Sequence, residues 1–192
     1  TINDRIHEVR TRFEVLRRDA EIKALKRELA GEIKAAADMT LDSQGNLVNK
    51  GHLSGQQVKV TAQNIDNTGE VLGDSMTLAA TNLNNTGSRA NIQATKTLNM
   101  DLQGQLNNQN GAKIQTPDGQ LTINAHTVNN DSRLAANQLN LTAEDLNNQT
   151  QNGTIYGTDT VDLTLSGQLH NSDNALIQSD NQLTINANGD IV

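Results

Sequence analysis

Residues 121–148 read LTINAHTVNNDSRLAANQLNLTAEDLNN. Apolar and polar side chains alternate at 121–125, and this period of two is typical of a strand with one buried face. An apolar-x-Asn triplet follows at 128–130, and a single apolar residue, Leu134, comes next. The same order of signals then starts again at Leu139. The stretch therefore contains one structural repeat and most of a second.

The repeat extends through most of the chain. Its triplet places an asparagine, in what we name the asparagine column, at Asn49, Asn67, Asn85, Asn108, Asn130, Asn148 and Asn171. Successive members lie 18, 18, 23, 22, 18 and 23 residues apart. The alternating strip also occurs earlier, at Met39 and Leu41, so the repeats begin near residue 30. Three short strands in each repeat predict a mainly β protein, a parallel β-solenoid of about seven to eight coils.

The composition determines what can fill such a solenoid. Aromatic residues make up 1% of the 192 residues, and there is no tryptophan. The interior must therefore be built from Leu, Ile, Val and Ala, which suit a narrow space. A single coil buries too few of them to offset the entropy of ordering its backbone, whereas a stack of coils can.

The chain changes character near residue 30. Residues 1–29 contain eight Lys/Arg, six Asp/Glu and no glycine, whereas residues 30–192 contain seven Lys/Arg against sixteen Asp/Glu. The first segment predicts one long amphipathic α-helix, and the second predicts the repeat domain. The helix either packs on its own chain, associates with copies of itself, or is an artificially joined segment. Its apolar residues Ile22, Leu25 and Leu29 are expected to shield the strand edges of the first coil.

The asparagine column has a structural explanation in the repeat. Asparagine tolerates a left-handed backbone at a corner, and stacked asparagine side chains can hydrogen-bond as a ladder. The functional alternative is a row of asparagines that binds a ligand.

The longer repeats predict a second feature, a row of loops. The segment from the triplet to the next apolar position is six residues in the short repeats and eight or nine in four others. Insertions in a solenoid form surface loops on one edge, where partners could bind. The candidate contact residues are Ser88, Arg89, Gln109, Asn110, Gln149, Asn152, Ser172 and Asn174.

Several functional classes lack support in the sequence. There is no cysteine, no apolar run long enough to span a membrane, and a net charge of −7 that disfavours nucleic acid as a partner. The histidines are scattered, so no metal or other cofactor is predicted. A β-helical carbohydrate-active enzyme needs clustered carboxylates. The candidates are Asp66, Glu70 and Asp74, or Glu144, Asp145, Asp159 and Asp162. We expect these to form a solvated acidic surface and the chain not to be an enzyme.

The repeat resembles the haemagglutinin repeats of filamentous haemagglutinin-like exoproteins. The runs that carry the resemblance are GQLHN at 167–171, LTINA at 183–187 and LTINA at 121–125. That family includes adhesins and the effector proteins of contact-dependent growth inhibition, exported by two-partner secretion. The resemblance covers about residues 30–192 and does not extend to residues 1–29.

The resemblance implies a right-handed parallel β-helix within a secreted filament on the bacterial cell surface. The chain would be a segment of a longer protein, and the filament would project an adhesive or toxin-delivery part. Its implied partners are an outer-membrane transporter during export and a receptor or glycan on a target cell. The alternative is that this segment itself binds the receptor or glycan through its loops.

Overall fold

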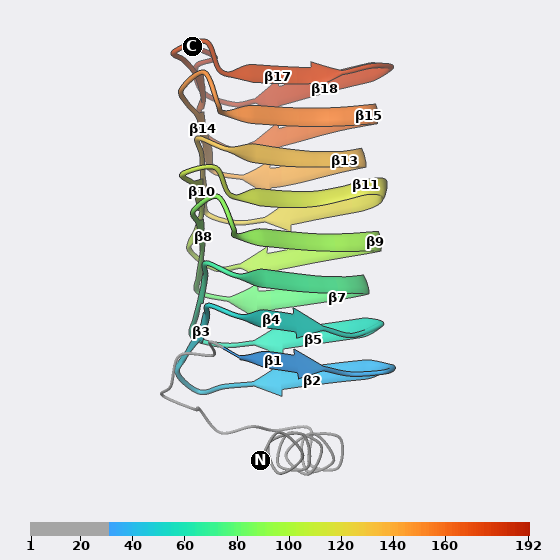
Figure 1. Ribbon diagram of the computed structural model, residues 1–192. Coiled ribbons are helices and arrows are strands. Elements are labelled where there is room, and N and C mark those ends of the chain that lie inside the picture. Colours follow the sequence, from blue (N-terminus) through green and yellow to red (C-terminus); the bar gives the residue numbers. More distant parts are fainter. Residues whose placement is uncertain (1–30) are drawn as a thin grey trace, which may run out of the picture.

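The computed structural model describes residues 31–192, and this part of the chain contains eighteen β-strands and no helix. Figure 1 shows the strands stacked in successive coils along one axis. The predicted helix at 1–29 and its shielding of the first coil lie outside the described residues. The parallel β-solenoid predicted from the repeat is confirmed, with about seven turns, and its right-handed sense stays a prediction.

One sheet is formed by the strands that carry the asparagine triplets. Its order is β16-β14-β12-β10-β8-β6-β3, and all neighbours are parallel. The strands are β3 (Asn46–Asn49), β6 (Asn64–Asn67), β8 (Asn82–Thr86), β10 (Gln105–Gln109), β12 (Thr127–Asn130), β14 (Asp145–Asn148) and β16 (Leu169–Asn171). We name this the asparagine sheet.

The second sheet has eleven strands, because five coils contribute one long strand that bends in its middle and three coils contribute two short strands each. The strands are β1 (Glu32–Lys34), β2 (Asp38–Asp42), β4 (His52–Ser54), β5 (Gln57–Thr61), β7 (Glu70–Ala80), β9 (Asn91–Leu102), β11 (Lys113–Asn124), β13 (Arg133–Ala143), β15 (Thr154–Leu165), β17 (Leu176–Ser179) and β18 (Gln182–Ala187). We call the part of each coil before the bend the first arm and the part after it the second arm. Register shifts mark the bend, as between Gly73 and Ser75.

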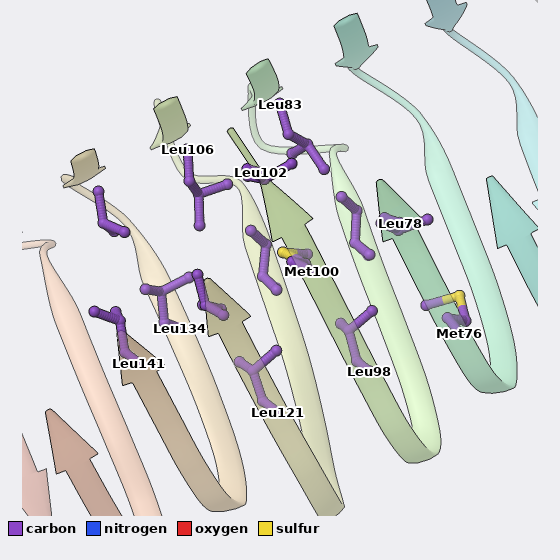
Figure 2. Packing of buried hydrophobic residues seen from close by; sticks show 14 of the residues in the cluster. Met76, Leu78, Leu83, Leu98, Met100, Leu102, Leu106, Leu121, Leu134 and Leu141 are labelled. Carbon is purple, nitrogen blue, oxygen red and sulfur yellow. The ribbon is translucent and has the colours of Figure 1, made fainter. Parts of the chain in front are cut away.

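The apolar strips point inward and stack from coil to coil. On the second arms, Ile123 pairs in register with Met100 on one side and with Leu141 on the other. Ile123 is fully buried, and Met100 and Leu141 are 1% exposed. Figure 2 shows such side chains aligned in the interior of the coils. Because a slip of one residue would turn a whole strip outward, burial of this row specifies the register.

The bend between the two arms is lined by small residues. In successive coils these are Gly73, Ala94, Thr116, Ala136 and Gly157. A Cβ atom on Gly157 would lie 2.3 Å from the carbonyl oxygen of Thr160, so even alanine does not fit there without movement. Residues on the two sides of the bend can therefore approach each other closely.

Candidate functional site

The asparagine column forms a continuous ladder inside the solenoid. The Nδ2 atom of each member donates to the Oδ1 atom of the next, at 2.8–2.9 Å, for all six steps from Asn49 to Asn171. Six of the seven side chains are at most 2% exposed, and Asn171 in the last complete triplet is half-buried. The buried amides are therefore paired with each other, as buried polar groups must be.

The column also closes the corner that follows it. Asn67 donates its Nδ2 hydrogen to the carbonyl oxygen of Gly69 in this corner at 2.9 Å, and Asn108 donates to the carbonyl oxygen of Arg133 in the next coil at 3.1 Å. The prediction of a left-handed backbone at these asparagines is wrong, because none of the column has a positive φ. They remain in extended strand conformation, which directs the side chain inward, where the amide bridges strand and turn. Six of the seven column side chains are therefore too deeply buried to contact a ligand.

A second set of amides lies on the outer surface of the asparagine sheet. Asn84, Asn107 and Asn129 are part of a ladder that runs from Asp66 to Asn147 at 2.7–2.9 Å. Here each Nδ2 donates toward the preceding coil, opposite in direction to the buried column. The doubled asparagines of the repeat signal this outer ladder, which the sequence reasoning missed.

The four long loops lie at the edge where the asparagine sheet meets the first arms (Figure 1). In these loops the non-glycine residues with left-handed backbone are Asn110, Thr150, Asp173 and Asn174, with φ between 56° and 67°, and Gly87 and Gly111 also have a positive φ. Of the eight candidate contact residues, six are exposed, while Gln109 and Ser172 are half-buried. The loops occur as two pairs in adjacent coils, and the short coil at residues 130–134 separates the pairs.

Two residues of that short coil support a neighbouring loop. Asn110 donates its backbone N–H to the Asp131 carboxylate at 3.0 Å, and Gly111 donates to the Ser132 hydroxyl oxygen at 2.9 Å. The Ser132 hydroxyl in turn donates to Asp131 at 3.0 Å. Asp131 and Ser132 therefore belong to the loop edge. Their position directly after the triplet could have identified them in the sequence.

The acidic candidates for a sugar-cleaving site lie on different parts of the solenoid. Asp66 belongs to the outer asparagine ladder. Glu70 lies on a first arm, where its Oε2 atom is 2.8 Å from His52 Nδ1. Asp74 lies at a bend and accepts a hydrogen bond from the Thr95 hydroxyl. They do not converge on one groove.

The second acidic group is also divided among elements. Glu144 lies 3.1 Å from the ring of His126, and Asp145 accepts the backbone N–H of Gln168. Hydrogen bonds from Asn181 and then Gln138 lower the pKa of Asp159. A general acid needs the opposite shift, toward neutral pH. Within residues 31–192, no three His, Cys, Asp or Glu side chains are grouped so that they could hold a metal ion.

Comparison with known proteins gives one informative similarity. The chain is 30% identical over 157 residues to the tRNA nuclease CdiA of Escherichia coli strain NC101. The match covers 82% of this chain but only 4% of that protein. No protein-family profile and no solved structure matches the chain. The described residues contain no helix long and apolar enough to cross a membrane.

The fold and this similarity together indicate the class of protein to which the chain can be compared. The chain forms a parallel β-solenoid with an apolar interior and polar ladders, and it is similar to a short part of a much longer protein. This is compatible with the resemblance to contact-dependent growth inhibition exoproteins. The nuclease activity in the relative's name belongs to that whole protein, of which the chain spans 4%.

Proposed function

We propose that the chain is a structural segment of a secreted β-helical filament on a bacterial cell surface, exported through an outer-membrane transporter. Its role is to project or present an adhesive or toxin-delivery part carried elsewhere in the filament. The segment itself performs no catalysis in this proposal. The similarity to CdiA supports the class, and the architecture supports the mechanical role.

The observation that carries the proposal is the unbroken stacking of the coils. Parallel pairing continues from β1 to β17 and through the whole asparagine sheet, and the buried amide ladder has no missing step. Each coil is therefore held by its two neighbours through backbone and side-chain hydrogen bonds. A rod built in this way resists bending and can be lengthened or shortened by whole coils.

The experiment is a deletion series in a parent filament that contains this segment. Removing residues 65–82 deletes one 18-residue coil and joins Asn64 to Leu83, which keeps the register because Asn64 and Asn82 pair in adjacent coils. The matched control removes residues 65–73, half a coil, and destroys the register. We expect the whole-coil deletion to keep surface display and target-cell binding, and the half-coil deletion to lose display.

The alternative function is recognition of a receptor or glycan by the four loops, and the exposure of six candidate contact residues favours it. These side chains are polar and offer no aromatic anchor, so each loop contributes little, and affinity would depend on repetition along the filament. Shortening all four loops to the length of the short coils separates the two functions. Unchanged cell binding supports the shaft, whereas lost binding with normal display supports recognition.

A further inference from the structure

The first long loop creates a step in the surface of the solenoid. The two coils before it turn directly from the asparagine sheet into β4 and β7, while loop 86–90 projects beyond them. A recess of about 410 Å³ lies at this step. Its lining includes Gly51 and Gly69, and a Cβ on Gly69 would lie 2.2 Å from the Gly51 carbonyl oxygen. Any side chain at position 69 would collide with this backbone, so this part of the recess stays open.

Positive charge is concentrated at the recess. Lys50, Arg89 and Lys113 all line it, although residues 30–192 contain only seven lysines and arginines against sixteen acidic residues. Within residues 31–192, no carboxylate lies within ion-pair distance of Arg89 or Lys113. One carboxylate, that of Glu70, also lines the recess, and its Oε2 atom is 2.8 Å from His52 Nδ1.

We propose that this recess binds a tetrahedral oxyanion, the phosphate or sulfate group of a ligand. The Arg89 guanidinium offers paired N–H donors that match two oxygens of such a group, and the Lys113 ammonium adds positive charge. The hydroxyl groups of Ser88 and Thr68, which also line the recess, supply further donors. Because the recess is open to water, binding of a single group is weak, with a Kd on the order of millimolar.

Another loop on the same edge shows how the chain satisfies such donors internally. At loop 109–112, the Asp131 carboxylate of the following coil accepts the backbone N–H of Asn110. Loop 86–90 has no equivalent: Gly87 donates to the backbone carbonyl oxygen of Gln109, and neither Ser88 nor Arg89 is bonded to a carboxylate within the described chain. A negative group from a ligand would complete this loop as Asp131 completes the other.

The test is a titration of the isotope-labelled chain with inorganic phosphate and, separately, with sulfate, followed by the amide NMR signals. We expect saturable shifts at Gly51, Gly69 and Ser88. Arg89→Gln should weaken binding severalfold, and Arg89→Gln with Lys113→Gln by about tenfold or more. Lys96→Gln is the matched control, because Lys96 is exposed at a bend of the other edge. Glucose serves as the neutral probe.

Removal of the opposing charge gives the inverse result. Glu70→Gln should strengthen phosphate binding about two- to fivefold, because it deletes the carboxylate that lines the recess. Both the loss and the gain variants should keep the rest of the amide spectrum unchanged. The proposal is overturned by shifts that do not saturate, by equal weakening in Lys96→Gln, by binding of glucose as strong as phosphate, or by weaker binding in Glu70→Gln. Preference for phosphate or for sulfate identifies which oxyanion the recess takes.

Discussion

At the scale of single residues, a hydrogen bond between two asparagine side chains contributes differently to stability inside and outside the solenoid. Asn108 is fully buried and connects Asn85 to Asn130, whereas Asn107 beside it connects Asn84 to Asn129 on the outer surface. The inner amide can be replaced only by a group that pairs, because water cannot reach its partners. The outer amide can exchange its partners for water.

This difference predicts the outcome of one substitution in two adjacent positions. Asn108→Asp places a carboxylate oxygen against the Asn130 oxygen and should lower the free energy of unfolding by at least about 3 kcal/mol at neutral pH. Asn107→Asp should change it by less than about 1 kcal/mol. Urea unfolding measures both. Equal effects at the two positions would show that the buried ladder does not stabilise the coils.

The apolar strips give a second prediction of the same kind. Ile123→Asp introduces an unpaired charge at a fully buried position, and we expect a loss of at least about 4 kcal/mol or failure to fold. Asn124→Asp, at the adjacent exposed position of β11, is the control and should be nearly neutral. Thermal unfolding distinguishes them. A normal melting curve for Ile123→Asp would contradict an inward-facing strip.

Thr116 gives a prediction of opposite sign. Its hydroxyl oxygen is fully buried at the bend of β11, and among the described residues its side chain alone has a buried polar atom without a hydrogen-bond partner. Thr116→Val keeps the shape and removes the unsatisfied group, so the free energy of unfolding should rise by about 1 kcal/mol. Thr122→Val, on the outer side of the same strand, should give no comparable gain. A destabilised Thr116→Val would mean that the hydroxyl has a partner, such as water.

At the scale of elements, the loops differ from the strands in how strongly their conformation constrains the residue type. Of the four non-glycine positions with a positive φ in these loops, three are occupied by Asn or Asp, which tolerate that conformation. The fourth is Thr150, with a φ of 67°, and its branched side chain disfavours that conformation. The loop at 149–153 therefore contains local backbone strain that the other loops avoid.

Relief of this strain should be measurable. Thr150→Asn, which copies the residue used at Asn110, should raise the free energy of unfolding by about 0.5–1 kcal/mol. Gln149→Asn, at the preceding position where φ is not positive, serves as the control and should have no such effect. Chemical denaturation compares the two variants. A loss of stability in Thr150→Asn would show that the hydrogen bond that Thr150 Oγ1 accepts from the backbone N–H of Asn152, at 3.2 Å, outweighs the strain.

At the scale of the whole molecule, the last coil presents the exposed large apolar residues of the described chain. Leu176, Leu183, Ile191 and Val192 are 44–66% exposed, and β17 and β18 each pair on one side only. An open strand edge with apolar side chains favours association with another edge. In the isolated chain, this open edge is therefore a surface through which copies can associate.

We expect the isolated chain to self-associate with rising concentration through this edge. Leu183→Lys combined with Ile191→Lys should shift the sedimentation profile toward monomer, because the charges oppose edge pairing. The control, Thr122→Lys with Thr142→Lys, adds the same charges to the side of the solenoid and should leave association unchanged. If both double variants behave alike, association does not proceed through the last coil.

The sequence by itself determined the architecture, because a repeated period is a property of the chain that stacking preserves. The strip at 121–125 and the triplet at 128–130 predicted which side chains face inward, and the same spacing predicted a loop edge. Sequence reasoning also anticipated that Asn108 and its equivalents could form a ladder. The predicted left-handed backbone at these asparagines was wrong, because asparagine is compatible both with a strand and with a left-handed corner. The three-dimensional structure shows that the strand conformation occurs.

Only the tertiary structure decided which residues of different coils meet. Lys50, Arg89 and Lys113 are far apart in the sequence, and the recess between them depends on a short coil lying beside a long one. The support of Asn110 by Asp131 and the separation of Asp66, Glu70 and Asp74 follow from the same cause. A coil contributes side chains to several faces, so the face on which each one lies depends on loop length and bend position, which a linear spacing does not specify.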